Sequence, residues 1–173
     1  MFKTTANKIT MLRIVLIPVF LVLAYADMMM AALAVYIVAC LSDFADGYIA
    51  RHYNQISNFG KFMDPLADKM LVLAAMCFFV ENGQMAGWAV AVVLFREFAV
   101  SGMRLLAVEQ GQVIAAAWSG KIKTAATMVC LILMLLVNNN VLNIVSTLVI
   151  VATTVYSGVE YFYVNRAVFK EAD

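Results

Sequence analysis

Charged residues are scarce in this sequence. They make up 13% of the 173 residues, against about 25% in soluble globular domains. Hydrophobic residues make up 65%, so water is the wrong solvent for most of the surface. A formal net charge of only +1 provides no bulk attraction for nucleic acid. The composition indicates a membrane protein and argues against a nucleic-acid-binding protein.

Paired cysteines are also lacking. Cys40, Cys77 and Cys130 lie far apart inside apolar runs, without the spacings of zinc sites or redox dithiols. Free cysteine behaves as a small apolar residue, so we expect all three in the core. The lone histidine, His52, is expected in a loop or at the membrane interface rather than in a metal site.

Long apolar segments occupy most of the chain. A helix crossing a bilayer core about 30 Å thick needs about 20 mostly apolar residues. The sequence therefore predicts an all-α polytopic membrane protein with six transmembrane helices in one domain, residues 1–173, because no linker is long enough to separate two domains. The first segment, which ends Ala24-Tyr25-Ala26, also resembles a signal peptide but is counted as the first helix. The segments are 9–26, 30–50, 62–80, 87–108, 125–137 and 141–163.

Basic residues gather on one side of this predicted bundle when its helices alternate in direction. The opposite connections contain only Asp27, Glu81 and uncharged polar residues, so the positive-inside rule predicts that both termini and the two longer loops are cytoplasmic. Arg96 alone is left inside a span, and its neighbour Glu97 is the expected partner. The residues on the basic side are Lys3, Lys8, Arg13, Arg51, Lys61, Lys69, Arg104, Lys121, Lys123, Arg166 and Lys170.

Four carboxylates lie near the cytoplasmic ends of the second and third predicted helices. Asp43 and Asp46 are three residues apart and Asp64 and Asp68 four apart, so each pair shares a helical face. Ionised side chains near hydrocarbon each cost on the order of several kcal/mol and require compensating cations. Clustered hard oxygen ligands are what Mg²⁺ or Mn²⁺ prefers. The pattern predicts a two-metal site, which can stabilise both the attacking and the leaving oxygen of an in-line displacement at phosphorus.

Other interpretations of these carboxylates exist. A buried network with Arg51, Lys61 and Lys69 could simply tie the helices together. Intramembrane carboxylates also mark ion-coupled transporters, but transporter sites lie near the midplane of broken helices, often with internal repeats, and this sequence has neither feature. A scaffold or channel-like protein is a third alternative.

Pro65 is tolerable only in a helix's first turn, so the third helix is expected to begin between Asn58 and Asp64.

The aspartates belong to a longer pattern: Asp, two residues, Asp-Gly, two residues, Ala-Arg, eight residues, Gly, three residues, Asp, three residues, Asp. The chain resembles the CDP-alcohol phosphotransferase family, whose signature this is, at every fixed position. Eight specified residues over 26 positions make the match specific. The positions are Asp43, Asp46, Gly47, Ala50, Arg51, Gly60, Asp64 and Asp68.

The resemblance implies a transferase that moves a phosphatidyl group from a CDP-linked lipid to an alcohol and releases CMP. Two divalent cations, Mg²⁺ or Mn²⁺, would bridge the diphosphate. The family's first three signature aspartates are metal ligands, and the fourth is both a ligand and the proposed general base. The implied ligands are Asp43, Asp46, Asp64 and Asp68, with Asp68 also catalytic. The residues implied to line the nucleotide and diphosphate site are Gly47, Arg51, Ser57, Gly60 and Asn7.

Flanking residues resemble the bacterial branch that uses CDP-diacylglycerol as donor and sn-glycerol 3-phosphate as acceptor, making phosphatidylglycerol phosphate in phospholipid biosynthesis. That acceptor is a dianion and needs fixed cations, and the guanidinium group suits phosphate geometry. Ordinary positive-inside anchoring is the alternative explanation for Arg104, Lys121 and Lys123. The candidate cations are Arg96, Arg104, Lys121 and Lys123. The flanking residues are Asn7, Thr10, Arg13, Arg96-Glu97-Phe98, Arg104-Leu105-Leu106 and Gly120 to Thr124.

Within the family, the acceptor could instead be inositol phosphate, serine or another alcohol. The resemblance also implies a homodimer in the bacterial inner membrane, in contact with membrane lipids. Its active site would face the cytoplasm.

Overall fold

The computed structural model describes the backbone of residues 5–52, 58–112, 114–115 and 117–169, and the side chains of residues 9–42, 63, 66–112, 114–115 and 117–169. This part of the chain is all-helical, with six α-helices, a short 3-10 helix and no strand. The all-α prediction is therefore confirmed. The elements are α1 (Thr5–Tyr25), α2 (Met29–His52), α3 (Asn58–Glu81), α4 (Gly87–Glu109), α5 (Trp118–Leu136), α6 (Asn140–Val164) and the 3-10 helix η1 (Arg166–Phe169).

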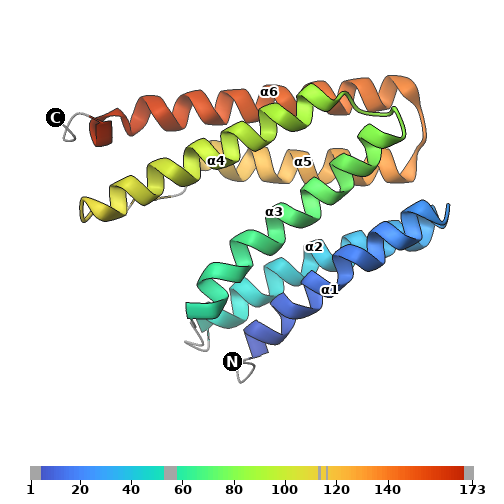
Figure 1. Cartoon of the computed structure of the whole chain (residues 1–173), viewed down its shortest axis with the longest axis horizontal. Helices are drawn as coiled ribbons and strands as arrows, with labels where there is room; N and C mark the ends of the chain where they lie inside the picture. Colours follow the sequence, from blue (N-terminus) through green and yellow to red (C-terminus); the bar gives the residue numbers. More distant parts are fainter. Residues whose placement is uncertain (1–4, 53–57, 113, 116, 170–173) are drawn as a thin grey trace.

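Successive helices run in opposite directions (Figure 1). The end of α2, the start of α3, the end of α4, the start of α5 and the end of α6 all lie toward the left of that view. The turns that join α1 to α2, α3 to α4 and α5 to α6 lie toward the right. This is the alternation that the positive-inside argument requires. The number of spans and the cytoplasmic location of the termini stay predictions.

The helices pack as two groups of three. In the first group α1 lies against α2 and α3, in the second α6 lies against α4 and α5, and α2 packs on α5 to join the groups. A shared core fills the space between them, and within it the rings of Phe20 and Tyr36 lie 5.5 Å apart. If lipid surrounds the bundle, close packing rather than expulsion of water holds such helices together, because lipid is as apolar as the core.

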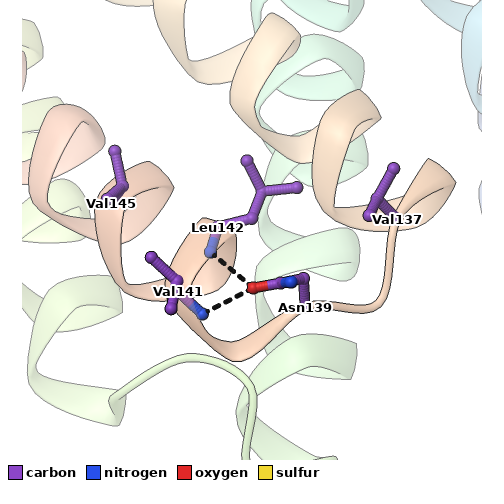
Figure 2. Close-up of a pocket in the computed structure, with 5 residues that line it drawn as sticks. All are labelled: Val137, Asn139, Val141, Leu142 and Val145. Carbon is purple, nitrogen blue, oxygen red and sulfur yellow. Dashed lines mark hydrogen bonds between the residues drawn. The ribbon is translucent and has the colours of Figure 1, made fainter.

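Short turns connect the helices. Asp27, Gly83 and Gly111 adopt left-handed backbone conformations with φ of 58°, 68° and 73°, which glycine adopts without steric cost. Asn139 caps α6, because its side-chain oxygen accepts the backbone N–H groups of Val141 at 2.9 Å and Leu142 at 3.3 Å (Figure 2). The cap satisfies two helix N–H groups that have no partner within the helix.

Large apolar side chains cover much of the outer surface; Phe95 is 77% exposed and Trp118 is 76% exposed. So many exposed large apolar side chains are unusual for a soluble monomer. Within the described residues, α5 and α6 are the two helices that are long and apolar enough to cross a membrane. The apolar parts of α1 and α2, Ile9–Tyr25 and Met29–Ser42, are shorter.

The third helix begins at Asn58, within the expected range, but two local expectations are wrong. Pro65 is the eighth residue of α3 and lies beyond its first turn. Membrane helices tolerate interior proline because neighbouring groups form hydrogen bonds with the backbone carbonyl that proline leaves without its helical N–H donor. Pro18 likewise lies inside α1. Cys77 is exposed, whereas Cys40 and Cys130 are buried as expected. A helix that is apolar all round gives little sequence signal for which face is buried.

Candidate active site

An arginine buried in α1 holds the carboxylate predicted to act as the general base. Arg13 has a fully buried side chain, and its Nη1 lies 2.5 Å from Oδ1 of Asp68 in α3, whose side chain is 36% exposed. The Nε of Arg13 also makes a long contact of 3.4 Å with Ser42 Oγ in α2, and that hydroxyl donates to the carbonyl of Ala39 at 2.7 Å. Arg13 thus joins the first three helices, and Asp68 keeps access to solvent.

A second ionic cluster surrounds Glu97 in α4. Glu97 Oε1 accepts from Lys123 Nζ at 2.6 Å and from Arg96 Nη1 at 3.1 Å. Its other oxygen lies 3.6 Å from Lys69 Nζ, which donates to Ser101 Oγ at 2.8 Å. The expected pairing of Arg96 with Glu97 is confirmed, and two lysines from other helices join it. This cluster, called the Glu97 cluster below, ties α3, α4 and α5 together.

Small residues make room for Arg96 between α5 and α6. A Cβ atom at Gly158 would lie 3.2 Å from Arg96 Cγ, and one at Gly120 would lie 3.5 Å from its Nη2. The same Nη2 donates to Ser157 Oγ at 2.6 Å. Arg96 Nε is buried without a hydrogen-bond partner. The guanidinium is therefore held in place by its surroundings while one of its donors stays unused.

The other two predicted acceptor cations lie on aromatic rings. Arg104 in α4 donates through Nε to the hydroxyl of Tyr161 in α6 at 2.9 Å, and its guanidinium lies 5.5 Å from that ring's centroid. Lys121 Nζ lies 4.7 Å from the ring centroid of Trp118, one turn earlier in α5. Both cations are exposed, so each is free to contact a ligand at the cytoplasmic end predicted from the sequence.

The signature residues lie on the facing ends of two helices. Asp43, Asp46, Gly47 and Arg51 are in the last turns of α2, and Gly60 and Asp64 are in the first turns of α3. Asn7 is in the first turn of α1. The side chains of these seven residues, and Ser57 as a whole, lie outside the described part of the structure. Their metal and nucleotide roles stay predictions, as does the role of Asp68.

A family model described as CDP-alcohol phosphatidyltransferase matches residues 3–157. The chain belongs to this family. The CDP-diacylglycerol--glycerol-3-phosphate 3-phosphatidyltransferase of Bacillus subtilis strain 168 is 39% identical over 189 residues, covering 96% of this chain and 97% of that protein. The probable phosphatidylglycerophosphate synthase of Mycobacterium tuberculosis H37Rv is 35% identical, covering 90% and 78%. The Escherichia coli K12 protein with the same name as the B. subtilis one is 37% identical, covering 71% of each chain.

The chain's family membership gives the two ionic clusters a chemical setting. In a CDP-alcohol phosphatidyltransferase the reacting groups are a diphosphate, an alcohol and, in some members, an acceptor phosphate, all of them anionic or polar. The described residues bring Arg13 to Asp68, and Lys69, Arg96 and Lys123 to Glu97. The described part of the bundle thus holds two carboxylates, Asp68 paired with one cation and Glu97 paired with three.

Sequence reasoning missed two residues of this arrangement. Arg13 was assigned to the basic side of the bundle and to the residues that resemble the bacterial branch, but no partner was predicted for it, although an arginine inside an apolar helix signals a functional site with a nearby partner. Glu97 was expected to pair with Arg96 alone, although carboxylates in membrane helices also carry that signal. The further partners come from other helices, and which helices they are depends on how each helix is rotated about its axis. Apolar runs in the sequence do not specify that rotation.

Proposed function

We infer that the chain transfers the phosphatidyl group of CDP-diacylglycerol to sn-glycerol 3-phosphate, giving phosphatidylglycerol phosphate and CMP in phospholipid biosynthesis. The observation that carries this proposal is the end-to-end match to the B. subtilis transferase, which spans 96% of this chain and 97% of that protein at 39% identity. The spacing of the signature aspartates supports the same reaction.

The donor set fits two divalent cations, Mg²⁺ or Mn²⁺, because carboxylate oxygens are their preferred ligands. Asp68 supports this fit, since its carboxylate is partly exposed and is held on one side by Arg13. The residues that would hold the metals are Asp43, Asp46, Asp64 and Asp68. When bound, such metals neutralise the diphosphate and stabilise the attacking and leaving oxygens.

In the proposed reaction Asp68 accepts the proton of the acceptor hydroxyl. That oxygen then attacks the β-phosphorus, the one that carries the diacylglycerol, and the bond to the CMP oxygen breaks. Arg13 fixes the orientation of Asp68, because a charge-assisted bond from a guanidinium restricts the carboxylate strongly. Gly47, Arg51, Ser57, Gly60 and Asn7 are proposed to bind the nucleotide and diphosphate.

The acceptor's phosphate is proposed to bind the cations predicted from the sequence. Fixed positive charges suit a phosphate dianion, and guanidinium groups bind phosphate in a bidentate manner. The Glu97 cluster supports this role, because it already holds two of these cations close to a single carboxylate oxygen. The proposed phosphate ligands are Arg96, Arg104, Lys121 and Lys123.

We place this enzyme in the bacterial inner membrane as a six-span protein whose termini and active site face the cytoplasm. Two apolar helices long enough to cross a bilayer and the exposed apolar side chains support a membrane location. A homodimer is part of the proposal, and native mass spectrometry from detergent tests it.

The test is an acceptor panel. Purified protein with CDP-diacylglycerol and Mg²⁺ is expected to release CMP with sn-glycerol 3-phosphate and to form phosphatidylglycerol phosphate detectable by mass spectrometry. Serine, inositol phosphate and water serve as comparison acceptors. CMP release with serine or inositol phosphate in preference to glycerol 3-phosphate would reassign the acceptor. Absence of CMP release with every acceptor, from folded protein, would contradict the transferase itself.

A further inference from the structure

The Glu97 cluster carries more positive charge than its one carboxylate neutralises. Lys123, Arg96 and Lys69 lie 2.6, 3.1 and 3.6 Å from Glu97 oxygens, and the three cations face a single anion. The side chains of Lys123 and Arg96 are only 8% and 12% exposed. No second acidic side chain within the described residues pairs with them, so in that part of the structure three cations face one anion, with Lys123 and Arg96 largely buried and Lys69 36% exposed.

The cluster cannot relax by moving apart. Its members come from α3, α4 and α5. Lys69 is also bonded to Ser101, and Arg96 is held by Ser157 and by the close approach of Gly158. Arg96 Nε is buried without a hydrogen-bond partner, and an unused buried donor is costly unless a ligand satisfies it. Fixed excess charge together with an unused donor is the arrangement of an anion site.

We propose that the Glu97 carboxylate occupies the place of the acceptor's phosphate while the site is empty. A phosphate dianion bound by Lys69, Arg96 and Lys123 would balance the two unmatched charges. The Glu97 carboxylate would then move away from these cations. The inference rests on the proposed function, because it deepens the acceptor site. It adds Lys69 to the phosphate ligands and gives Glu97 the role of an internal competitor.

The position of Lys69 in the chain relates the replacement of Glu97 by phosphate to the proposed reaction. Lys69 directly follows Asp68 in α3, so the added phosphate ligand and the proposed base are adjacent residues of one helix. The acceptor, whose hydroxyl is separated from its phosphate by a three-carbon chain, would extend from Lys69 toward Asp68. An alcohol without a phosphate cannot displace Glu97 from its cations. The carboxylate therefore selects phosphorylated acceptors as a class.

Inorganic phosphate is the probe that separates this proposal from catalysis. Purified protein in detergent with excess chelator is unfolded thermally over a range of phosphate concentrations, and the rise in Tm gives an apparent Kd because a ligand of the folded state stabilises it. Glu97→Gln is expected to bind phosphate about tenfold more tightly than wild type, since a like charge a few ångströms away is removed. Glu160→Gln is the matched control, because this half-buried glutamate of α6 forms no ion pair in the described structure; its Kd should equal that of wild type.

A second variant covers the case in which Glu97→Gln does not fold. Glu97→Asp keeps the charge but withdraws the carboxylate by one methylene from the cations, so phosphate should bind more tightly than in wild type by a smaller factor. Weaker phosphate binding in either variant overturns the proposal, because Glu97 would then orient the cations rather than compete for them. If the Glu97 variants bind phosphate more tightly but the wild-type protein shows no transferase activity, the anion site stands and the proposed function is wrong. If the wild-type protein is active but the Kd for phosphate is the same in the variants, the proposed function stands and the role of Glu97 as a competitor is wrong.

Discussion

Asp68 and Lys69 are consecutive residues of α3, yet their side chains pair with helices of different groups: Asp68 with Arg13 of α1 and Lys69 with Glu97 of α4. Consecutive side chains on a helix point about 100° apart, so one short segment of α3 serves both clusters. The proposed base and one proposed phosphate ligand, Lys69, therefore share one rigid element, and a shift of α3 would misplace both together.

Arg13 is expected to act by positioning Asp68. Arg13→Lys keeps the charge but loses the planar guanidinium group, so we expect kcat to fall about 10-fold. In Arg13→Ala we expect kcat to fall about 100-fold, which approaches the effect of losing a general base. KM for CDP-diacylglycerol should change little in either variant. Steady-state kinetics on purified protein measures both constants. Ser42→Ala, which removes the 3.4 Å contact with Arg13 and the hydroxyl's bond to the Ala39 carbonyl but leaves the Arg13–Asp68 pair, is the control and should stay near wild type. Equal activity of Arg13→Ala and wild type would contradict the positioning role.

Asp68→Asn should separate binding from chemistry. An amide keeps one acceptor oxygen, so metal and donor binding can partly survive, but it cannot accept the hydroxyl proton. We expect turnover to fall by about 10² to 10⁴ and to stay low in excess Mg²⁺. Asp43→Asn, at a residue proposed only as a ligand, should recover part of its activity as metal is added. Restoration of Asp68→Asn to near wild-type turnover by metal would leave Asp68 as a ligand without a base role.

Chelation is expected to abolish transfer. Without divalent cations the carboxylates of α2 and α3 would repel a diphosphate rather than bind it. CMP release is measured after dialysis against excess chelator and again after Mg²⁺ or Mn²⁺ is returned, with Ca²⁺ as a comparison ion. Full turnover in the chelator would exclude the two-metal proposal.

Arg104 and Lys121 should affect the acceptor rather than the donor. Alanine at either is expected to raise KM for glycerol 3-phosphate about 5- to 10-fold, the effect of losing one charge-assisted contact, while the Kd for CDP-diacylglycerol stays nearly unchanged. Arg166→Ala is the matched control, since this cation also lies on an aromatic ring, 5.3 Å from the centroid of Tyr163. Equal loss of donor binding in the Arg104 or Lys121 variant would mean that these residues are misplaced.

Cysteine accessibility tests the topology. After the three native cysteines are replaced by serine or alanine, cysteines introduced near Lys61 and Lys121 should react with a membrane-impermeant maleimide only after the cells are opened. Cysteines near Glu81 and Asn139 should react in intact cells, because those turns lie at the other end of the bundle (Figure 1). Labelling near Lys61 in intact cells would invert the orientation.

The sequence predicted the helices well but placed some of their starts too late. Apolar runs gave the number and order of the helices, and the predicted fourth helix, 87–108, differs from α4 by one residue. The fifth was predicted to begin at Ala125, whereas α5 begins at Trp118. Charges at Lys121 and Lys123 ended the apolar run there, although the helix accommodates both: Lys123 is neutralised by Glu97 and Lys121 lies on Trp118.

The candidate site could be predicted only where residues are close in sequence. The pairing of Arg96 with Glu97 followed from adjacency, and the common face of Asp64 and Asp68 follows from helical spacing. The pairing of Arg13 with Asp68 spans 55 residues and that of Lys123 with Glu97 spans 26. Such contacts depend on how each helix is rotated about its axis, and a helix that is apolar all round leaves that rotation open.

The burial of Arg13 bears on the order in which the protein is made. Arg13 emerges from the ribosome 55 residues before its partner Asp68, so α1 is made before the carboxylate that pairs with its arginine exists. An ionised side chain inside a membrane helix is costly until it finds its partner, so the stable insertion of α1 is expected to depend on α3. A chain truncated before Asp68 should therefore integrate α1 less completely than one that extends through α3.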